Sequence, residues 1–171
     1  MNQESTIAAP DLLDHSVAKP FDLNRLIEKL AHVRQHEHRN IVIILDLNKK
    51  LLKTSADRQQ IEYVLLSLFA RARNAIIEAR SLYGTIAVRT AIRADKVQFS
   101  ISDEGVAERS PGILGPIFRR KPEDDINLTR SAEIVQDQGG QLYAWRPHHP
   151  AVTTIVMDLP IADTASEGLP R

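Results

Sequence analysis

Cysteine is absent from this sequence of 171 residues, and aromatic residues make up only 5% of it. Without cysteine the chain has no disulfide and no thiolate metal site. Lysine and arginine together number 22, as do aspartate and glutamate, so neither sign of charge is in excess. A net charge of zero argues against a general nucleic-acid binder and against electrostatic binding to a membrane surface.

Long hydrophobic runs are also missing. The longest wholly apolar run is Ile41–Leu45, which is far too short to span a membrane. The N-terminus lacks the basic start and the apolar core of a signal peptide. We therefore expect a cytoplasmic protein with no membrane insertion and no nucleic-acid partner. The length indicates one domain, and a hydrophobic fraction of 43% can form a sizeable core.

The strongest pattern in the chain predicts a helix over residues 57–78. Apolar residues recur at spacings of three and four and form one stripe: Ile61, Val64, Leu65, Leu68, Ala72 and Ala75. Asp57 followed by Gln60 is similar to a capping box. A polar ridge runs along the edge of this stripe and consists of Ser67, Arg71, Asn74 and Glu78. The ridge indicates either a site beside a sheet or a solvated helix face.

The other elements follow from periodicity and turn residues. A helix is expected within residues 20–35, with one apolar face of Leu23, Leu26, Ile27, Leu30 and Val33. Strands are expected at 41–47, 85–93, 96–102, 141–145 and 153–160, and a further helix at 128–138. We expect a flexible N-terminal segment at 1–19, the domain at 20–160 and a flexible tail at 161–171. His32 and His36 have the spacing of a metal-binding pair, but surface histidines are the simpler interpretation.

The helix at 57–78 resembles the N-box helix of histidine-kinase-type ATPase domains, which have the GHKL or Bergerat fold. That family carries a segment of the type D-x-x-Q-L-x-x-V-L-L-N-L-x-x-N-A-x-x-A. The match comprises Asp57, Gln60, Ile61, Val64, Leu65, Leu66, Leu68, Ala72 and Ala75. Ser67 and Arg71 replace the two asparagines. In the family the second asparagine holds the magnesium ion that bridges the ATP phosphates.

Two later segments carry the same resemblance. Asp103 and Gly105 match the family's D-x-G-x-G box, in which the aspartate hydrogen-bonds the adenine amino group, and Ala107 replaces the second glycine. The segment at 113–123 resembles the family's phenylalanine box through Phe118, Lys121, Pro122 and Glu123.

The family's glycine-rich lid, whose N–H groups close over the phosphates, has no counterpart in this sequence. Asp124, Asp125, Ile126 and Asn127 stand in its place, and no glycine lies between Gly115 and Gly139. Glycine supplies the close backbone approach that such a lid needs. Consecutive carboxylates would repel a nucleotide triphosphate, although they also suit the start of a helix.

The resemblance covers residues 21–160 and implies an α/β two-layer sandwich, with a mixed β-sheet and three helices on one face. The positions that match the family's ATP motifs, here eroded, are Ser67, Arg71, Asn74, Asp103, Gly105, Ala107, Phe118 and Lys121. We therefore expect no catalytic residue, no metal ligand and no cofactor; the alternative is ATP with magnesium.

Three functions are compatible with this pattern. The first is a protein-binding or regulatory module of two-component signalling that does not hydrolyse ATP, with a histidine kinase, a response regulator or another signalling protein as partner. The second is an ATP-binding kinase domain in which Arg71 contacts a phosphate. The third is a histidine phosphotransferase, which the short segment before Phe21 disfavours. His15 has Pro20 five residues later, as a phospho-accepting histidine would, but lacks an acidic neighbour because Ser16 follows it.

Arg71 is the most informative departure from the family pattern. Its position beside the apolar stripe directs it at the place of the family's nucleotide pocket rather than at water. A guanidinium that is partly desolvated there needs an anionic partner. The candidates are Asp103 and the three carboxylates Glu123, Asp124 and Asp125. We expect Arg71 to form an ion pair with at least one of them.

Overall fold

A computed structural model describes the chain at residues 19–37, 39–78, 83–103, 122–145 and 153–162, without the side chains of 122–126 and 145. Four of the predicted site residues lie outside these ranges: Gly105, Ala107, Phe118 and Lys121. His15 and most of both predicted terminal segments also lie outside them. The proposed domain limits therefore stay a prediction.

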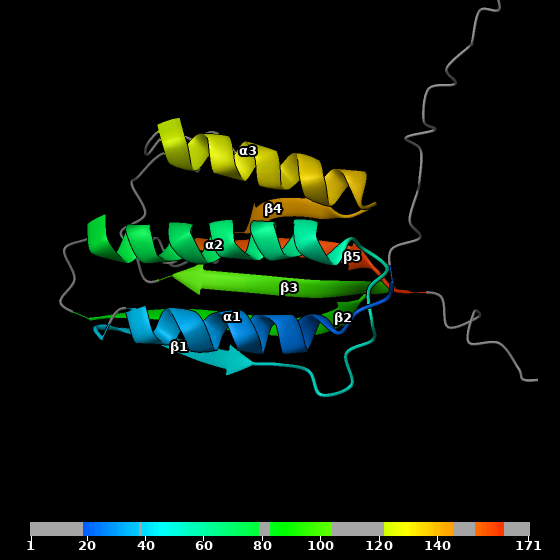
Figure 1. The fold of residues 1–171 in the computed structure, drawn as a ribbon, viewed down its shortest axis with the longest axis horizontal. Helices are drawn as coiled ribbons and strands as arrows, with labels where there is room; N and C mark the ends of the chain where they lie inside the picture. The colour runs from blue at the N-terminus through cyan, green and yellow to red at the C-terminus, as the bar shows by residue number, and fades with distance from the viewer. Residues whose placement is uncertain (1–18, 38, 79–82, 104–121, 146–152, 163–171) are drawn as a thin grey trace, which may run out of the picture.

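The described chain contains three helices and five strands (Figure 1). In chain order they are α1 Leu23–Glu37, β1 Ile41–Asp46, α2 Arg58–Glu78, β2 Gly84–Arg93, β3 Lys96–Asp103, α3 Pro122–Asp137, β4 Gln141–Trp145 and β5 Thr153–Pro160. Every predicted strand is present within one residue of its expected ends. Helix α3 begins six residues earlier than expected, because Pro122 suits a first helical position and the apolar pattern starts only at Leu128.

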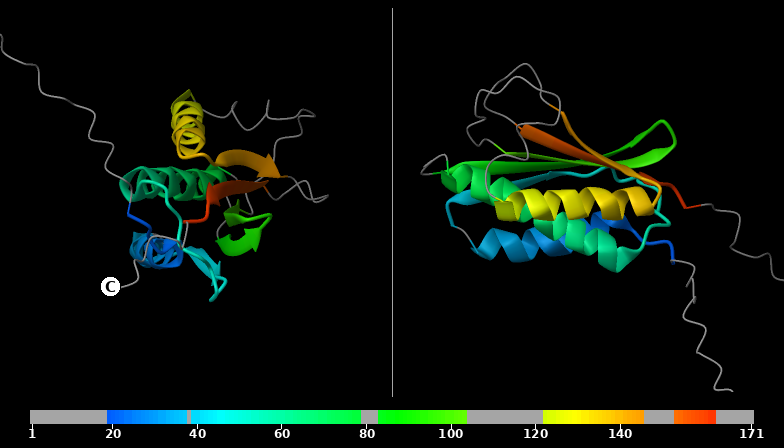
Figure 2. Two further views of the ribbon diagram at one scale, coloured as in Figure 1. Left: turned by 90° about the vertical axis from the view of Figure 1, so that its right-hand side faces the viewer. Right: turned by 90° about the horizontal axis from the view of Figure 1, so that it is seen from above.

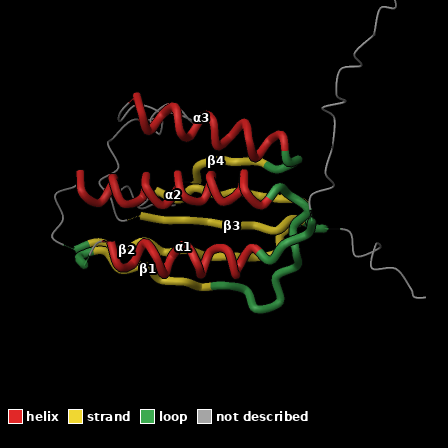
Figure 3. The backbone as a smooth tube through the Cα atoms, viewed as in Figure 1, coloured by secondary structure: helices red, strands yellow, loops and turns green. Residues whose placement is uncertain are grey.

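The strands form one mixed sheet in the order β1-β2-β3-β5-β4. Strands β1 and β2 are parallel, and the other neighbours are antiparallel. All three helices lie on one face of this sheet, with α2 between α1 and α3 (Figures 1, 2 and 3). This arrangement is the two-layer α/β sandwich that the resemblance implies, so the predicted fold class is confirmed.

The core lies between the helices and the middle strands. On β3 every second residue is buried, and Val97, Phe99 and Ile101 face the helices. The stripe of α2 packs onto them, and Ile61, Val64, Leu65 and Leu68 are each fully buried. Asp103 continues the alternation of β3, so the strand ends with a carboxylate on the helix side of the sheet. The core thereby fixes where Asp103 points.

One predicted core residue is exposed. Val33 in α1 is 52% exposed, whereas Ala31 is buried. The buried stripe continues from Leu30 through Ala31, which turns Val33 away from the sheet in the last turn of the helix. The prediction for Val33 was wrong because spacing alone does not show whether position 31 or position 33 faces the sheet.

The predicted turns after β2 and after α3 are both present, at the same end of the sheet, where the Lys96 ammonium donates to the Gly139 carbonyl at 3.3 Å. Ala94 and Asp95 join β2 to β3 with φ angles of 45° and 59°, as a two-residue hairpin turn requires. Gly139 ends α3 with a φ of +73°, and the Gly140 N–H donates to the Val135 carbonyl at 2.9 Å. None of the helices described here is long and apolar enough to cross a membrane.

Candidate functional site

The N-terminal end of α2 is held by its own cap and by the end of α3. The N–H of Gln60 donates to the Asp57 carboxylate at 2.9 Å, which confirms the predicted cap. The Gln138 side chain accepts from the Asp57 N–H at 2.7 Å and donates to the Gln60 side chain at 2.9 Å. These bonds fix the start of α2 relative to α3. They therefore also fix the direction of the polar ridge that α2 carries.

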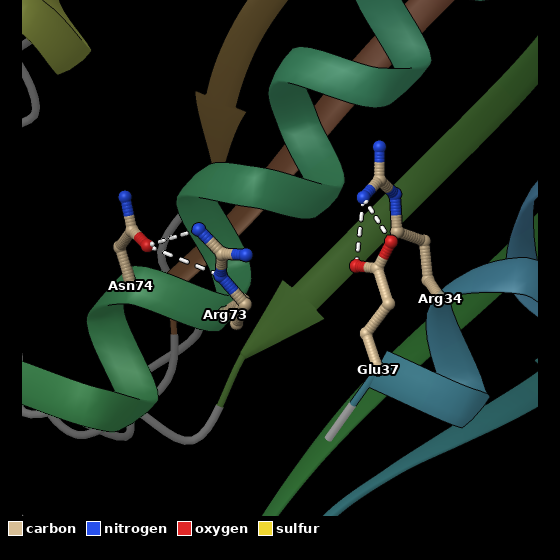
Figure 4. Close-up of polar contacts among 4 residues, drawn as sticks. All are labelled: Arg34, Glu37, Arg73 and Asn74. Atoms are coloured by element: carbon tan, nitrogen blue, oxygen red, sulfur yellow. Dashed lines mark hydrogen bonds and ion pairs between the residues drawn. The ribbon is translucent and has the colours of Figure 1, made fainter.

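The four ridge residues have different surroundings. The Ser67 hydroxyl donates to the Tyr63 carbonyl one turn earlier, at 3.0 Å, and so bonds within its own helix. Asn74 accepts two hydrogen bonds from Arg73, at 3.2 Å and 3.0 Å (Figure 4). Glu78 is exposed at the end of the helix. Arg71 reaches across to the sheet.

Arg71 and Asp103 form an ion pair between α2 and the end of β3. The Arg71 Nη1 donates to the Asp103 Oδ2 at 2.9 Å. The Arg71 side chain is 13% exposed and that of Asp103 only 2%. A charge-assisted hydrogen bond of this length between two buried side chains is among the stronger polar contacts in proteins. The expected pairing of Arg71 is therefore confirmed, with Asp103 as the partner.

The surroundings of Asp103 are polar on the strand next to it. Thr153 on β5 lies opposite Asp103 in the antiparallel register and is 5% exposed. One residue along, the hydroxyls of Ser102 and Thr154 lie 2.8 Å apart, on the other face of the sheet. Asp103 is thus the last residue of β3 and lies beside the threonines at the start of β5, with Arg71 bonded to it from α2.

Arginine limits what this arrangement can do chemically. A guanidinium has five N–H donors and no acceptor, and it stays protonated at all relevant pH values. Arg71 cannot be a ligand of a cation, and it cannot act as a general base. It can hold an anion, and in this structure that anion is the carboxylate of Asp103.

Besides the bonds of Gln138, sequence reasoning missed a link between α2 and α3 at Tyr63. The Tyr63 hydroxyl lies 3.5 Å from the Asn127 side-chain oxygen, at the limit of a hydrogen bond. Asn127 also accepts a bond from the buried Ser131 hydroxyl through its carbonyl oxygen, at 2.7 Å. Tyr63 stands one turn before Ser67, so its place near the ridge could have been inferred from spacing alone.

The candidate metal pair in α1 forms a ring contact. The rings of His32 and His36 meet edge to face, with centroids 4.9 Å apart. Within the described ranges, no three histidine, cysteine or acidic residues gather in a way that could hold a metal ion. The two histidines thus pack on each other at the end of the helix.

Comparison with known proteins supports the fold. No protein-family model matches the chain, and the search of curated proteins found no significant match. Among solved structures, a nucleotide-free catalytic domain of histidine kinase ThkA matches 83% of this chain and 94% of its own, with 25% identity and a TM-score of 0.67. The mycobacterial sensor histidine kinase MprB matches 85% of this chain and 98% of its own, with 19% identity and a TM-score of 0.68.

A third similar structure is a complex. It contains histidine kinase ThkA with the response regulator TrrA, and the match covers 84% of this chain and 41% of the ThkA chain, with 22% identity and a TM-score of 0.63. The chain described here therefore has the fold of histidine-kinase catalytic domains. At these identities the similarity shows the fold alone.

Proposed function

We propose that this chain is a histidine-kinase-type ATPase-like domain that acts as a protein-binding or regulatory module in two-component signalling, without hydrolysing ATP. The Arg71–Asp103 pair is the observation that supports this proposal most strongly. The resemblance assigns one of these positions to the magnesium ion and the other to adenine. A bond between them uses both positions at once.

The described residues fit a magnesium nucleotide poorly. Magnesium takes oxygen ligands, and a guanidinium at the position of the magnesium-binding asparagine brings a positive charge instead. Asp103 already accepts a charged donor at Oδ2 and its side chain is only 2% exposed, so an adenine amino group has little access to this carboxylate. We therefore assign no catalytic step to a nucleotide.

The proposed partner is another signalling protein, either a histidine kinase or a response regulator. ThkA, which shares this fold, has been crystallised with a response regulator, and that contact belongs to ThkA. A domain that keeps this fold but not the nucleotide contacts can still offer its surface to such proteins, because function resides in sites and not in the fold.

Calorimetric titration with ATP and Mg²⁺ tests the proposal. We expect a Kd weaker than ~1 mM, which corresponds to about −4 kcal/mol. The control is an active histidine-kinase catalytic domain under the same conditions. We also expect Arg71→Asn to bind ATP no better than about this limit, because it restores the asparagine without the glycine-rich lid. Micromolar binding by the natural chain would contradict the proposal, and its loss in Arg71→Asn would favour a kinase domain in which Arg71 contacts a phosphate.

A further inference from the structure

Strand β1 is an edge of the sheet. It pairs with β2 on one side, and no other strand of the described ranges lies on its other side (Figure 1). Its sequence is IVIILD, in which Asp46 is the one charged residue. Val42 and Ile44 are each 53% exposed, and Leu45 is 37% exposed. Because proteins usually protect an edge with charges, proline or a covering element, an exposed apolar edge is a place where another strand can add.

The backbone of β1 presents hydrogen-bonding groups on this outer side. The N–H of Gly84 in β2 donates to the carbonyl of Asn40 at 2.9 Å, which shows that even-numbered residues of this segment point their backbone groups at β2. The odd-numbered residues of β1 therefore point their N–H and C=O groups outward, away from β2. These residues are Ile41, Ile43 and Leu45.

The Gln35 side chain of α1 bonds this edge as a neighbouring strand would. It donates to the Ile41 carbonyl at 2.8 Å and accepts from the Ile43 N–H at 2.7 Å. A side-chain amide carries the same kinds of donor and acceptor as a peptide group, so Gln35 takes the place of one peptide unit of an added strand. The Ile43 carbonyl and both backbone groups of Leu45 have no hydrogen bond to any residue that the structure describes.

We propose that β1 pairs with β1 of a second copy of this chain, in antiparallel orientation. Charge complementarity favours this occupant, because Arg39 precedes the strand and Asp46 ends it. Antiparallel pairing brings the acidic end of each strand to the basic end of the other, whereas parallel pairing would bring like charges together. With Ile43 opposite Ile43 of the second copy, Val42 lies opposite Ile44 of the second copy. This register covers both of the exposed aliphatic side chains.

The second copy and Gln35 compete for the same backbone groups. In this register the Gln35 amide releases the Ile41 carbonyl and the Ile43 N–H, and the backbone of the second copy bonds both groups instead. Since one hydrogen bond replaces another at each group, burial of Val42 and Ile44 drives the association. One strand from each copy forms a small interface, so we expect a weak dimer that depends on concentration.

The test is sedimentation equilibrium of the full chain, without ligand, over about 1 μM to about 1 mM. We expect a reversible equilibrium between monomer and dimer. Amide hydrogen exchange, followed by NMR at both ends of this range, should show that the Leu45 N–H becomes protected as the dimer forms. A monomer at every concentration would overturn the proposal. A monomer with a protected Leu45 N–H would also overturn it, because another part of the same chain would then cover the edge.

Matched variants of the protein complete the test. Ile44→Lys should weaken the dimer about tenfold or more, because it places a lysine in the paired edge. Ile77→Lys is the control and should leave the dimer unchanged, since Ile77 is equally exposed, at 52%, but lies on α2. Gln35→Ala should tighten the dimer about threefold or more, because it removes the competing amide.

Leu45→Pro tests the backbone directly. It removes an outward N–H and keeps the bonds of β1 to β2, since proline is tolerated at such positions of an edge strand. We expect this variant to remain a monomer, and circular dichroism checks that it folds. If it does not fold, the comparison of Ile44→Lys with Ile77→Lys decides. Equal dimers in these two lysine variants, a weaker dimer in Gln35→Ala, or an unchanged dimer in folded Leu45→Pro would each overturn the proposal.

Discussion

Arg71 and Arg73 are two residues apart on the same helix and have opposite surroundings. Arg71 is 13% exposed and bonds a carboxylate that is 2% exposed, on a different element of the fold. Arg73 is half-buried at the rim of a pocket and bonds the amide of its own neighbour, Asn74. Arg71 therefore stabilises the interior of the domain, whereas Arg73 lies at its surface.

Arg71→Asn should have the largest effect on stability. It removes the guanidinium from a buried ion pair with Asp103, and breaking a buried pair in this way costs roughly 3–5 kcal/mol. Urea unfolding, followed by circular dichroism, gives the free energy of unfolding for the variant and the natural chain. An unchanged unfolding midpoint would show that the pair does not stabilise the domain.

Arg73→Asn is the same substitution on the other side of the helix, and its effect should be much smaller. Partly exposed polar contacts of this kind contribute about 1 kcal/mol or less. The same urea experiment measures the effect. If Arg73→Asn destabilised the protein as much as Arg71→Asn does, the contrast between interior and surface arginines would fail.

Tyr143 on β4 should have the smallest effect on stability, and this effect depends on pH. Partial burial raises the pKa of the Tyr143 hydroxyl, and the nearby charge of Asp158 raises it further, while Arg93 opposes the shift. The folded state therefore retains the proton more tightly than the unfolded state, whose tyrosine pKa is about 10. The resulting stability is fully present below pH ~10 and is lost as the pH rises through the folded pKa.

Tyr143→Phe should remove this alkaline loss and leave the stability near neutral pH little changed. Urea midpoints of both proteins at about pH 8 and about pH 10.5 provide the comparison. Parallel curves for the two proteins over this range would show that Tyr143 does not contribute to the pH dependence.

Local patterns in the sequence predicted the helices and strands well, because alternation in strands and spacing in helices report directly on burial. The arrangement of these elements in one two-layer sandwich was expected from the family resemblance. The pairing of Arg71 could be expected for the same reason: the ridge of α2 and the end of β3 each had a clear periodicity. Sequence alone left four candidate anions, since the choice among them depends on how far α2 extends over the sheet.

A small pocket between α1 and α2, which Arg34 and Arg73 line, had no such signal. It joins side chains from two helices and two strands, and their contact depends on the crossing of α1 and α2. The early start of α3 was also missed, because the apolar pattern begins only after its first turn. Contacts between elements, rather than elements themselves, are what local patterns do not encode.

A double-mutant cycle on Arg71 and Asp103 shows whether these two side chains stabilise the domain as a pair. The free energies of unfolding are measured for the natural chain, Arg71→Met, Asp103→Asn and the double variant, and the cycle isolates the interaction between the two side chains. We predict a coupling of roughly 2 kcal/mol or more. The losses of unfolding free energy in the two single variants should therefore add up to more than the loss in the double variant. A coupling below about 0.5 kcal/mol would mean that the two groups act independently and would contradict a site closed by this pair.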